Sequence, residues 1–262
     1  MNIKFFYSAI VFLFTNFLTS AVEWQGRPRI DHSQIIICNN VIKVTGPELH
    51  VFTSDTFKAK NTEKYRISGM VRSVKGEKKF YLGVACYDKM GNMIEGQYAV
   101  PIMGSDTVLI EEIKPGDRVI TVQDASNWKK QPGTFVALNI KENYADLPNR
   151  DLGRGPVTHI EQEQITGKWL VTFRLPFRKA YPAGIGIRQQ HGPVYLYLLS
   201  GKTLKTEWQS FSAIVDCRKM DISNKFNRGL FPKTVAFRFV AFIPGKNTDG
   251  FEMKDIKIDL YK

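Results

Sequence analysis

Alternation of apolar and polar residues is the dominant pattern along this 262-residue chain. In residues 65–72 the odd positions are Tyr, Ile, Gly and Val, and the even positions are mostly polar or charged. In residues 80–87 the even positions are Phe, Leu, Val and Cys. Because successive side chains of a strand point to opposite faces, this pattern predicts two strands, each with one face in a core.

A short polar segment, residues 73–79, separates these two strands, and we predict that it joins them into a β-hairpin. Asp88-Lys89-Met90-Gly91-Asn92 follows the second strand. Asp and Asn can bond to their own backbone there and Gly can supply positive φ, so a turn is predicted before a third strand at Met93. Consecutive hairpins of this kind build antiparallel sheets.

The rest of the chain also predicts strands. Apolar or alternating runs occur at 34–38, 41–44, 194–199, 208–215, 234–242 and 253–260. Helical periodicity is essentially absent, so the predicted class is all-β. Residues 116–188 have a different rhythm, with five short strands bounded by turn signals, and predict a small β-barrel inserted in the larger domain. The predicted division is 22–115 with 193–262 for a β-sandwich, and 116–192 for the inserted barrel.

The N-terminus carries the signals of secretion. Residues 1–4 are short and basic, residues 5–17 are mainly apolar, and Thr19-Ser20-Ala21 offers small residues for cleavage. We predict a signal peptide over 1–21 and a secreted or extracellular-surface protein without a stable membrane span. The alternative is an N-terminal membrane anchor, but the apolar run is shorter than the roughly 20 residues that cross a bilayer.

The net charge indicates which kinds of partner the protein would bind. The formal net charge is +12, which favours anionic partners such as acidic polysaccharide, a membrane surface or nucleic acid. Nucleic acid ranks last, because the chain has no nucleic-acid-binding motif and a signal peptide directs it elsewhere.

The chain has an odd number of cysteines, so at most one internal disulfide is expected. Cys38 with Cys217 is the first pair to test, and Cys86 would then be the free thiol.

Five motifs occur in a fixed order along the chain: Tyr-Arg-Ile-Ser-Gly-x-Val-Arg, Tyr-Asp-x-x-Gly, Trp-Gln-x-Phe, Val-Ala-Phe-Arg-Phe-Val-Ala-Phe and Met-Lys-Asp-Ile-Lys-Ile-Asp-Leu. In order and spacing they resemble the galactose-binding-like jelly-roll β-sandwiches that serve as carbohydrate-binding modules. The resemblance covers about 35–114 and 193–262. The segment 116–188 is foreign to that family and is similar to small β modules of bacterial and phage surface proteins that begin with Gly-Asp-x-x-Ile-x-Val-x-Asp-Ala.

The resemblance implies a location for ligands. In such jelly rolls the glycan lies on a concave sheet face or in the loops at one end, and a structural calcium ion often joins the first and last strands. Asp255 matches the position of the carboxylate from the last strand. Calcium takes six or more oxygen ligands, and Asp255 is the one that the sequence identifies.

Sugar binding without catalysis needs aromatic rings against pyranose faces and polar groups for the hydroxyls. On the non-core faces of the predicted hairpin, with one tyrosine just beyond it and one tryptophan in a turn of the insert, the candidates are Arg66, Arg72, Tyr81, Tyr87, Tyr98 and Trp128. The alternative for the tyrosines is that they cover a second layer of core. Trp208 resembles a structural tryptophan of the family and is expected in the core.

Catalytic patterns are weak. His159, Glu161 and Glu163 alternate along one strand and imitate a metal site, but such a polar set is also typical of the solvated face of an antiparallel strand. Glu111 and Glu112 are adjacent, so they point to opposite faces and cannot act as a glycosidase pair. The sequence contains no nucleophile elbow, zinc-protease helix or phosphate loop. We therefore predict no catalysis.

Three functional hypotheses remain. The first is a secreted, non-catalytic carbohydrate-binding protein that recognises an acidic or sulfated polysaccharide or cell-surface glycan. The second is an extracellular adhesion or structural protein whose partner is another protein. The third is an enzyme of the polysaccharide-lyase type, which would use Tyr81, Tyr87 and Arg66.

Overall fold

The computed structural model describes residues 22–26, 34–46, 49–153, 155–222, 229–244 and 249–261. The predicted signal peptide, 1–21, lies outside the described residues. The ladders between the named strands are all antiparallel, and the only helices among the described residues are the short α1 (Gly96–Ala99) and the 3-10 turn η1 (Glu142–Tyr144). The predicted all-β class is confirmed. No helix in the described ranges is long and apolar enough to cross a membrane.

One sheet has seven strands, with the order β1-β4-β17-β7-β15; β5 pairs with β17, and β8 pairs with β7. Its strands are β1 (Trp24–Gly26), β4 (Leu49–Thr53), β5 (Phe57–Lys58), β7 (Lys78–Tyr87), β8 (Met93–Ile94), β15 (Leu196–Leu204) and β17 (Ala236–Ile243).

The second sheet has five strands in the order β16-β6-β18-β3-β2. Its strands are β2 (Gln34–Cys38), β3 (Val41–Thr45), β6 (Lys64–Ser73), β16 (Gln209–Asp216) and β18 (Phe251–Leu260). Asn39 and Asn40 both adopt positive φ, which suits the tight turn that joins β2 to β3, and the predicted strand pair at this point is confirmed.

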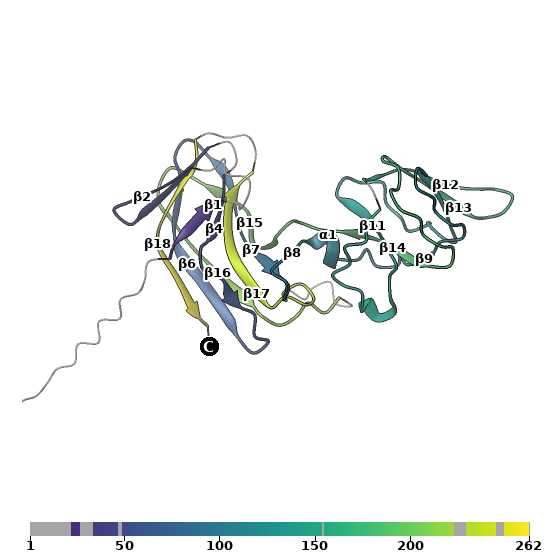
Figure 1. The fold of residues 1–262 in the computed structure, drawn as a ribbon. Helices are drawn as coiled ribbons and strands as arrows, with labels where there is room; N and C mark the ends of the chain where they lie inside the picture. The colour runs from purple at the N-terminus through teal and green to yellow at the C-terminus, as the bar shows by residue number, and fades with distance from the viewer. Residues whose placement is uncertain are drawn as a thin grey trace, which may run out of the picture.

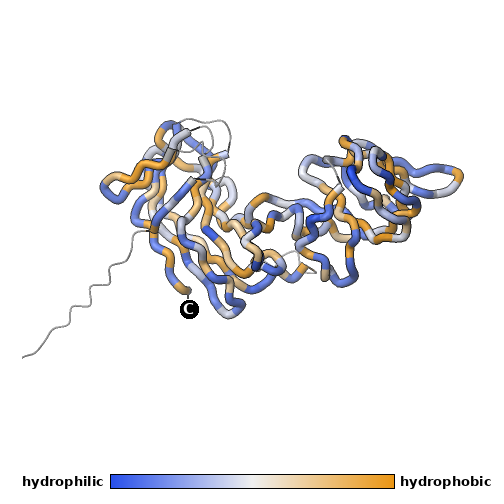
Figure 2. Tube along the Cα trace, in the orientation of Figure 1, coloured by the Kyte–Doolittle hydropathy of each residue, from blue (hydrophilic) through white to orange (hydrophobic). Residues whose placement is uncertain are grey.

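The two sheets pack face to face around one hydrophobic cluster, which makes this part of the molecule a β-sandwich (Figure 1). Phe80 of β7 contacts residues of the opposite sheet, with ring centroids 6.1 Å from Phe211 and 5.7 Å from Phe251. The alternation predicted these buried faces correctly, since Ile67, Val71 and the even positions 80–86 are fully buried. Figure 2 shows apolar and polar stretches interspersed along the chain trace.

The predicted hairpin of β6 and β7 is wrong. These strands are consecutive in the chain but belong to different sheets, because β6 pairs with β16 and β18, whereas β7 pairs with β15 and β17. The segment after Ser73 therefore crosses from one sheet to the other. Both core faces meet inside the sandwich, and the two non-core faces point away from each other.

The turn predicted at Asp88 is confirmed, and it closes the real hairpin of β7 and β8. The Asp88 carboxylate accepts hydrogen bonds from the backbone N–H groups of Met90 and Asn92, both at 2.9 Å. Gly91 has a φ of 77°, a left-handed conformation that glycine adopts without a steric penalty.

Between β8 and β15 the chain forms a second body, which we call the inserted unit and define as residues 101–191 (Figure 1). It contains two three-stranded sheets, β10-β13-β12 and β11-β14-β9. The strands are β9 (Thr107–Val108), β10 (Val119–Val122), β11 (Thr134–Leu138), β12 (Val157–Gln162), β13 (Trp169–Phe173) and β14 (Gly186–His191). Its hydrophobic cluster includes Leu109 and Ile113, so this core takes in residues before the expected boundary at 116.

Polar contacts join the inserted unit to the sandwich. Arg150 donates to the Asp88 carboxylate at 3.2 Å and to the Met93 carbonyl at 2.9 Å, and its guanidinium carbon lies 4.9 Å from the ring centroid of Tyr98. Asn149 N–H donates to the Tyr98 carbonyl at 2.7 Å. These contacts tie one loop of the inserted unit to the turn after β7.

Candidate functional site

Aromatic side chains gather on the outer face of the seven-stranded sheet, away from the sandwich core. Phe52, Ala85, Tyr195, Val240 and Phe242 are buried there, and Tyr81, Tyr87 and Met93 pack against them. We call these residues, together with His50 and Tyr197, the aromatic cluster. Alternation explains the arrangement, because each strand sends every second side chain to this face.

A row of rings crosses four neighbouring strands within this cluster. His50 of β4 stacks on Phe242 of β17 with centroids 4.6 Å apart and an interplanar angle of 13°. Phe242 stacks on Tyr81 of β7 at 5.0 Å and 14°, and Tyr81 meets Tyr197 of β15 at 5.6 Å. The register pairs Phe242 with both His50 and Tyr81, so the cross-strand pairing itself places the rings in contact.

The cluster is covered at its centre and open at its edge. Tyr195 lies 5.8 Å from the ring centroids of both Phe52 and Phe242 and is 2% exposed, whereas Tyr197 is 37% exposed. Gly83 lies beneath this part of the face, and a Cβ atom there would come within 2.7 Å of the Leu196 carbonyl. The absence of a side chain at Gly83 thus lets β15 lie close to β7.

Burial changes the acidity of two of these tyrosines. Burial raises the pKa of Tyr87 above its ordinary value, and the nearby Arg238 guanidinium opposes that rise. Burial also raises the pKa of Tyr197, and Tyr81 adds to the effect. Both phenols are therefore neutral hydrogen-bonding groups at neutral pH.

The predicted ligand residues do not share one surface. Tyr81 and Tyr87 belong to the aromatic cluster, but Arg66 and Arg72 lie on the outer face of the five-stranded sheet, because β6 and β7 are in opposite sheets. Arg72 donates to the Glu252 carboxylate at 2.7 Å. Tyr98 is at the junction under Arg150.

Two tryptophans are placed differently from the expectation. Trp128, expected as an exposed platform, is 7% exposed in the core of the inserted unit, and its Nε1–H donates to the Ser105 carbonyl at 2.8 Å. Trp208, expected in the core, is half-buried at the sandwich surface. Its ring centroid lies 4.6 Å from both the Arg72 guanidinium carbon and the Lys254 ammonium.

The sequence raised the question of a metal at two places, Asp255 and the strand that contains His159. Asp255 is exposed, has a φ of 54° and lies where the register of β18 against β6 shifts. His159 contacts Glu161 at 2.9 Å on the exposed side of β12. In the part of the chain that the structure describes, no three His, Cys, Asp or Glu side chains are arranged to hold a metal ion. The calcium ligand at Asp255 stays a prediction.

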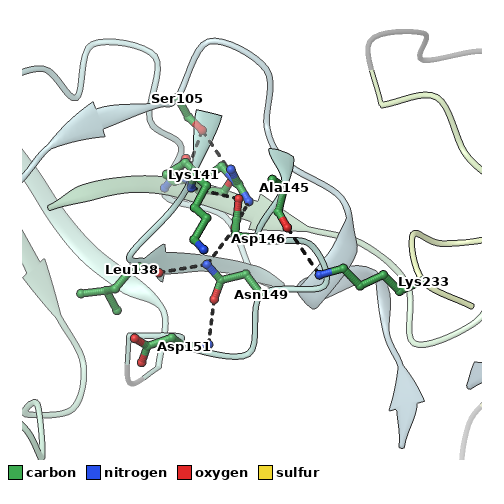
Figure 3. Close-up of polar contacts among 10 residues, drawn as sticks. Ser105, Leu138, Lys141, Ala145, Asp146, Asn149, Asp151 and Lys233 are labelled. Carbon is green, nitrogen blue, oxygen red and sulfur yellow. Dashed lines mark hydrogen bonds and ion pairs between the residues drawn. The ribbon is translucent and has the colours of Figure 1, made fainter. Parts of the chain in front are cut away.

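The inserted unit contains a buried polar network, drawn in part in Figure 3. Arg188 of β14 is fully buried and donates to the Asp146 carboxylate at 2.5 Å. Asn149 donates to the same carboxylate and to the Leu138 carbonyl, both at 2.9 Å. The Tyr144 ring centroid lies 5.2 Å from the Arg188 guanidinium carbon. This network fixes the loop that also makes the junction with the sandwich.

The ionisation of this network follows from its contacts. Burial raises the pKa of Asp146, but the Lys141 N–H, Asn149 and the Arg188 guanidinium outweigh burial and hold this pKa below its ordinary value. Burial raises the pKa of Asp106, and Arg188 only partly offsets the rise. Asp146 is therefore the carboxylate that pairs with the buried guanidinium.

Sequence reasoning missed His50, Phe242 and Tyr197 as site residues. The alternation in 194–199 and 234–242 could have placed Tyr197 and Phe242 on outer faces, but only the strand order brings them beside Tyr81. Arg188 and Asp146 were also missed, since a strand residue and a loop residue 42 positions apart carry no local signal of pairing.

The architecture defines an all-β protein of antiparallel sheets. Comparison of the chain with protein-family models gives no match, and comparisons with curated proteins and with solved structures give none either. The function is therefore argued from the described residues.

Proposed function

We propose that this chain is a secreted, non-catalytic carbohydrate-binding protein that recognises an acidic or sulfated polysaccharide. The observation that carries the proposal is the row His50, Phe242, Tyr81 and Tyr197, in which successive centroids are 4.6 to 5.6 Å apart. Tyr197, which is 37% exposed, and the half-buried Tyr81 offer ring surface to pyranose rings, and their phenol groups can bond to hydroxyls. Phe242 is 5% exposed and stacked between His50 and Tyr81, so its part is to hold the row together. The excess of basic residues favours a polymer with negative groups.

The architecture is compatible with this function. A two-sheet antiparallel sandwich with a ligand face on one sheet is what the resemblance to galactose-binding-like jelly rolls implies. In our proposal the sandwich is such a jelly roll, and the inserted unit is a small β-barrel. The proposal assigns no metal.

A second candidate is an extracellular adhesion or structural protein. It is favoured by the hairpin of β2 and β3 at the edge of the five-stranded sheet, where Ile36 is 52% exposed and Ile37 is 59% exposed. Exposed apolar edge strands are templates for pairing with another chain. The lyase hypothesis combined Tyr81, Tyr87 and Arg66, and it lacks geometric support because Arg66 lies on the other sheet.

The test is binding of the mature chain to a panel of neutral, carboxylated and sulfated polysaccharides. We expect Tyr81→Ala and Tyr197→Ala each to weaken binding roughly fivefold, since losing one aromatic contact costs about 1 kcal/mol. Tyr261→Ala is the matched control, because Tyr261 is 41% exposed but extends from the other sheet.

The outcomes separate the two candidates. Absence of binding to every polysaccharide of the panel refutes carbohydrate recognition. Equal weakening by Tyr197→Ala and Tyr261→Ala refutes the aromatic cluster as its location.

A further inference from the structure

Two loops of the inserted unit, residues 114–118 and 174–179, lie together, and we call them the arginine loops. Phe173 N–H donates to the Arg118 carbonyl at 2.7 Å, and Phe177 N–H donates to the carbonyl of the residue before Arg118 at 2.8 Å. Phe173 and Phe177 are buried in the core of the unit, with ring centroids 4.9 Å apart. The loops are therefore held to the core of the inserted unit by Phe173 and Phe177, and their charged side chains are on the surface.

The charges on these loops are only partly neutralised. Lys114 pairs with Glu112 at 2.8 Å, and Lys179 pairs with Asp151 at 2.6 Å. The carboxylate within the loops, on Asp117, accepts a hydrogen bond from the Lys114 N–H at 2.7 Å. Over the described ranges of the chain, no ion pair forms at the three exposed arginines of these loops, which are Arg118, Arg174 and Arg178.

The residue type indicates the ligand chemistry. A guanidinium group is planar, always charged and able to donate two parallel hydrogen bonds to a sulfate or carboxylate. Leu175 between the arginines is 41% exposed and adds apolar surface. Three unpaired guanidinium groups on adjoining loops match a polymer that carries negative groups at intervals, because each group can meet one arginine.

A chain of contacts links these loops to the aromatic cluster. Lys179 is paired with Asp151, and the preceding residue Arg150 donates to the carbonyl of Met93, which packs in the aromatic cluster. The arginine loops are thus connected, through the junction at Arg150, to the end of the aromatic cluster that contains Met93. A polysaccharide several sugars long is a ligand that can contact both.

We propose that the arginine loops bind the sulfate or carboxylate groups of the same polysaccharide whose sugar rings rest on the aromatic cluster. This inference rests on the proposed carbohydrate-binding function and deepens it. The sandwich contributes contacts to sugar rings, and the inserted unit contributes selectivity for charge.

The test compares a sulfated polysaccharide with its chemically desulfated counterpart. The variant removes three charges from the loops by Arg118→Gln, Arg174→Gln and Arg178→Gln. The matched control removes three charges from exposed lysines of the sandwich, which form no ion pair with any residue in the described ranges, by Lys58→Gln, Lys205→Gln and Lys257→Gln. All six residues are exposed, so both variants should keep the wild-type urea midpoint.

We expect the arginine variant to bind the sulfated polymer at least about tenfold more weakly at low salt, with a flatter salt dependence and unchanged binding of the desulfated polymer. The lysine control should change binding much less. Equal losses in both variants, or no loss in the arginine variant, overturn the inference. If the wild-type protein binds neither polymer, the proposed function itself fails. If it binds both and Tyr81→Ala weakens both, that function stands whatever the arginine variant shows.

Discussion

Removing the Asp146 carboxylate should destabilise the inserted unit strongly. Arg188 is 0% exposed and the Asp146 side chain is 6% exposed, so Asp146→Ala leaves a guanidinium buried without its counter-charge. Breaking a buried pair by removing one partner costs about 3–5 kcal/mol. With a urea dependence of about 2 kcal/mol per molar, the midpoint for unfolding of this unit should fall by roughly 2 M.

The assay is urea unfolding followed by tryptophan fluorescence, since Trp128 lies in the core of the inserted unit. The double variant Asp146→Ala with Arg188→Met removes both charges and should be more stable than Asp146→Ala by about 2 kcal/mol, because no unpaired ion remains. Glu112→Ala breaks an exposed pair of the same unit and should leave the midpoint unchanged. Additive effects in the double variant, or an unchanged midpoint for Asp146→Ala, would refute the reasoning.

The same network predicts a dependence on pH. Burial raises the pKa of Asp146, but the hydrogen bonds from Lys141 and Asn149 and the charge of Arg188 lower it by more than burial raises it. The folded-state pKa therefore lies below the ordinary 3.8. A depressed folded pKa contributes stability that is present above the unfolded pKa and is lost as pH falls through the folded one. The urea midpoint should be level from pH 7 to about pH 5 and should fall below about pH 4. Asp146→Asn should reduce that fall, and an unchanged fall would contradict the assignment.

Two further predictions concern the sandwich. Gly83→Ala should cost about 1–3 kcal/mol in thermal or urea unfolding, because its Cβ would lie 2.7 Å from the Leu196 carbonyl; a neutral result would contradict the close approach of the two strands. Burial raises the pKa of Cys86 and of Cys217 to about 11, whereas Cys38 is exposed, so a thiol reagent at pH 8 should modify Cys38 alone in the folded protein. Mass spectrometry of the peptides checks this, and rapid labelling of either buried thiol would refute it.

The thiol positions also bear on disulfide pairing. Cys38 lies on the edge strand β2 and is exposed, whereas Cys217 is buried in the core of the sandwich. All three cysteines are free in the structure, and this placement does not support the Cys38–Cys217 pair suggested by the sequence. The spacing of the cysteines in the sequence could not reveal their placement, because a disulfide depends on the distance between two backbone positions in the folded chain, and the sequence does not give that distance.

The fold class and the buried faces could be predicted well because they depend on local periodicity. The strands β6 and β7 were located with their core faces correct, and the turn at Asp88 was predicted from its own side chains. The error lay in the pairing of these strands. A short polar connection fits a hairpin and a crossing between two sheets equally well, since both reverse the chain direction over a few residues.

Because β6 and β7 were paired wrongly, the candidate site was also predicted with side chains that lie on two different sheets. The sequence by itself determined which side chains of each strand face the core, because alternation is a property of the extended chain. Only the tertiary structure decided what each outer face lies beside, because strand order depends on contacts between distant segments. The strand order places Arg66 and Arg72 on a different sheet from Tyr81. It also places Phe242, which is 161 positions away in the chain, against Tyr81. A binding surface made of four strands is set by their pairing, which is a property of the packed sheet and not of any one strand.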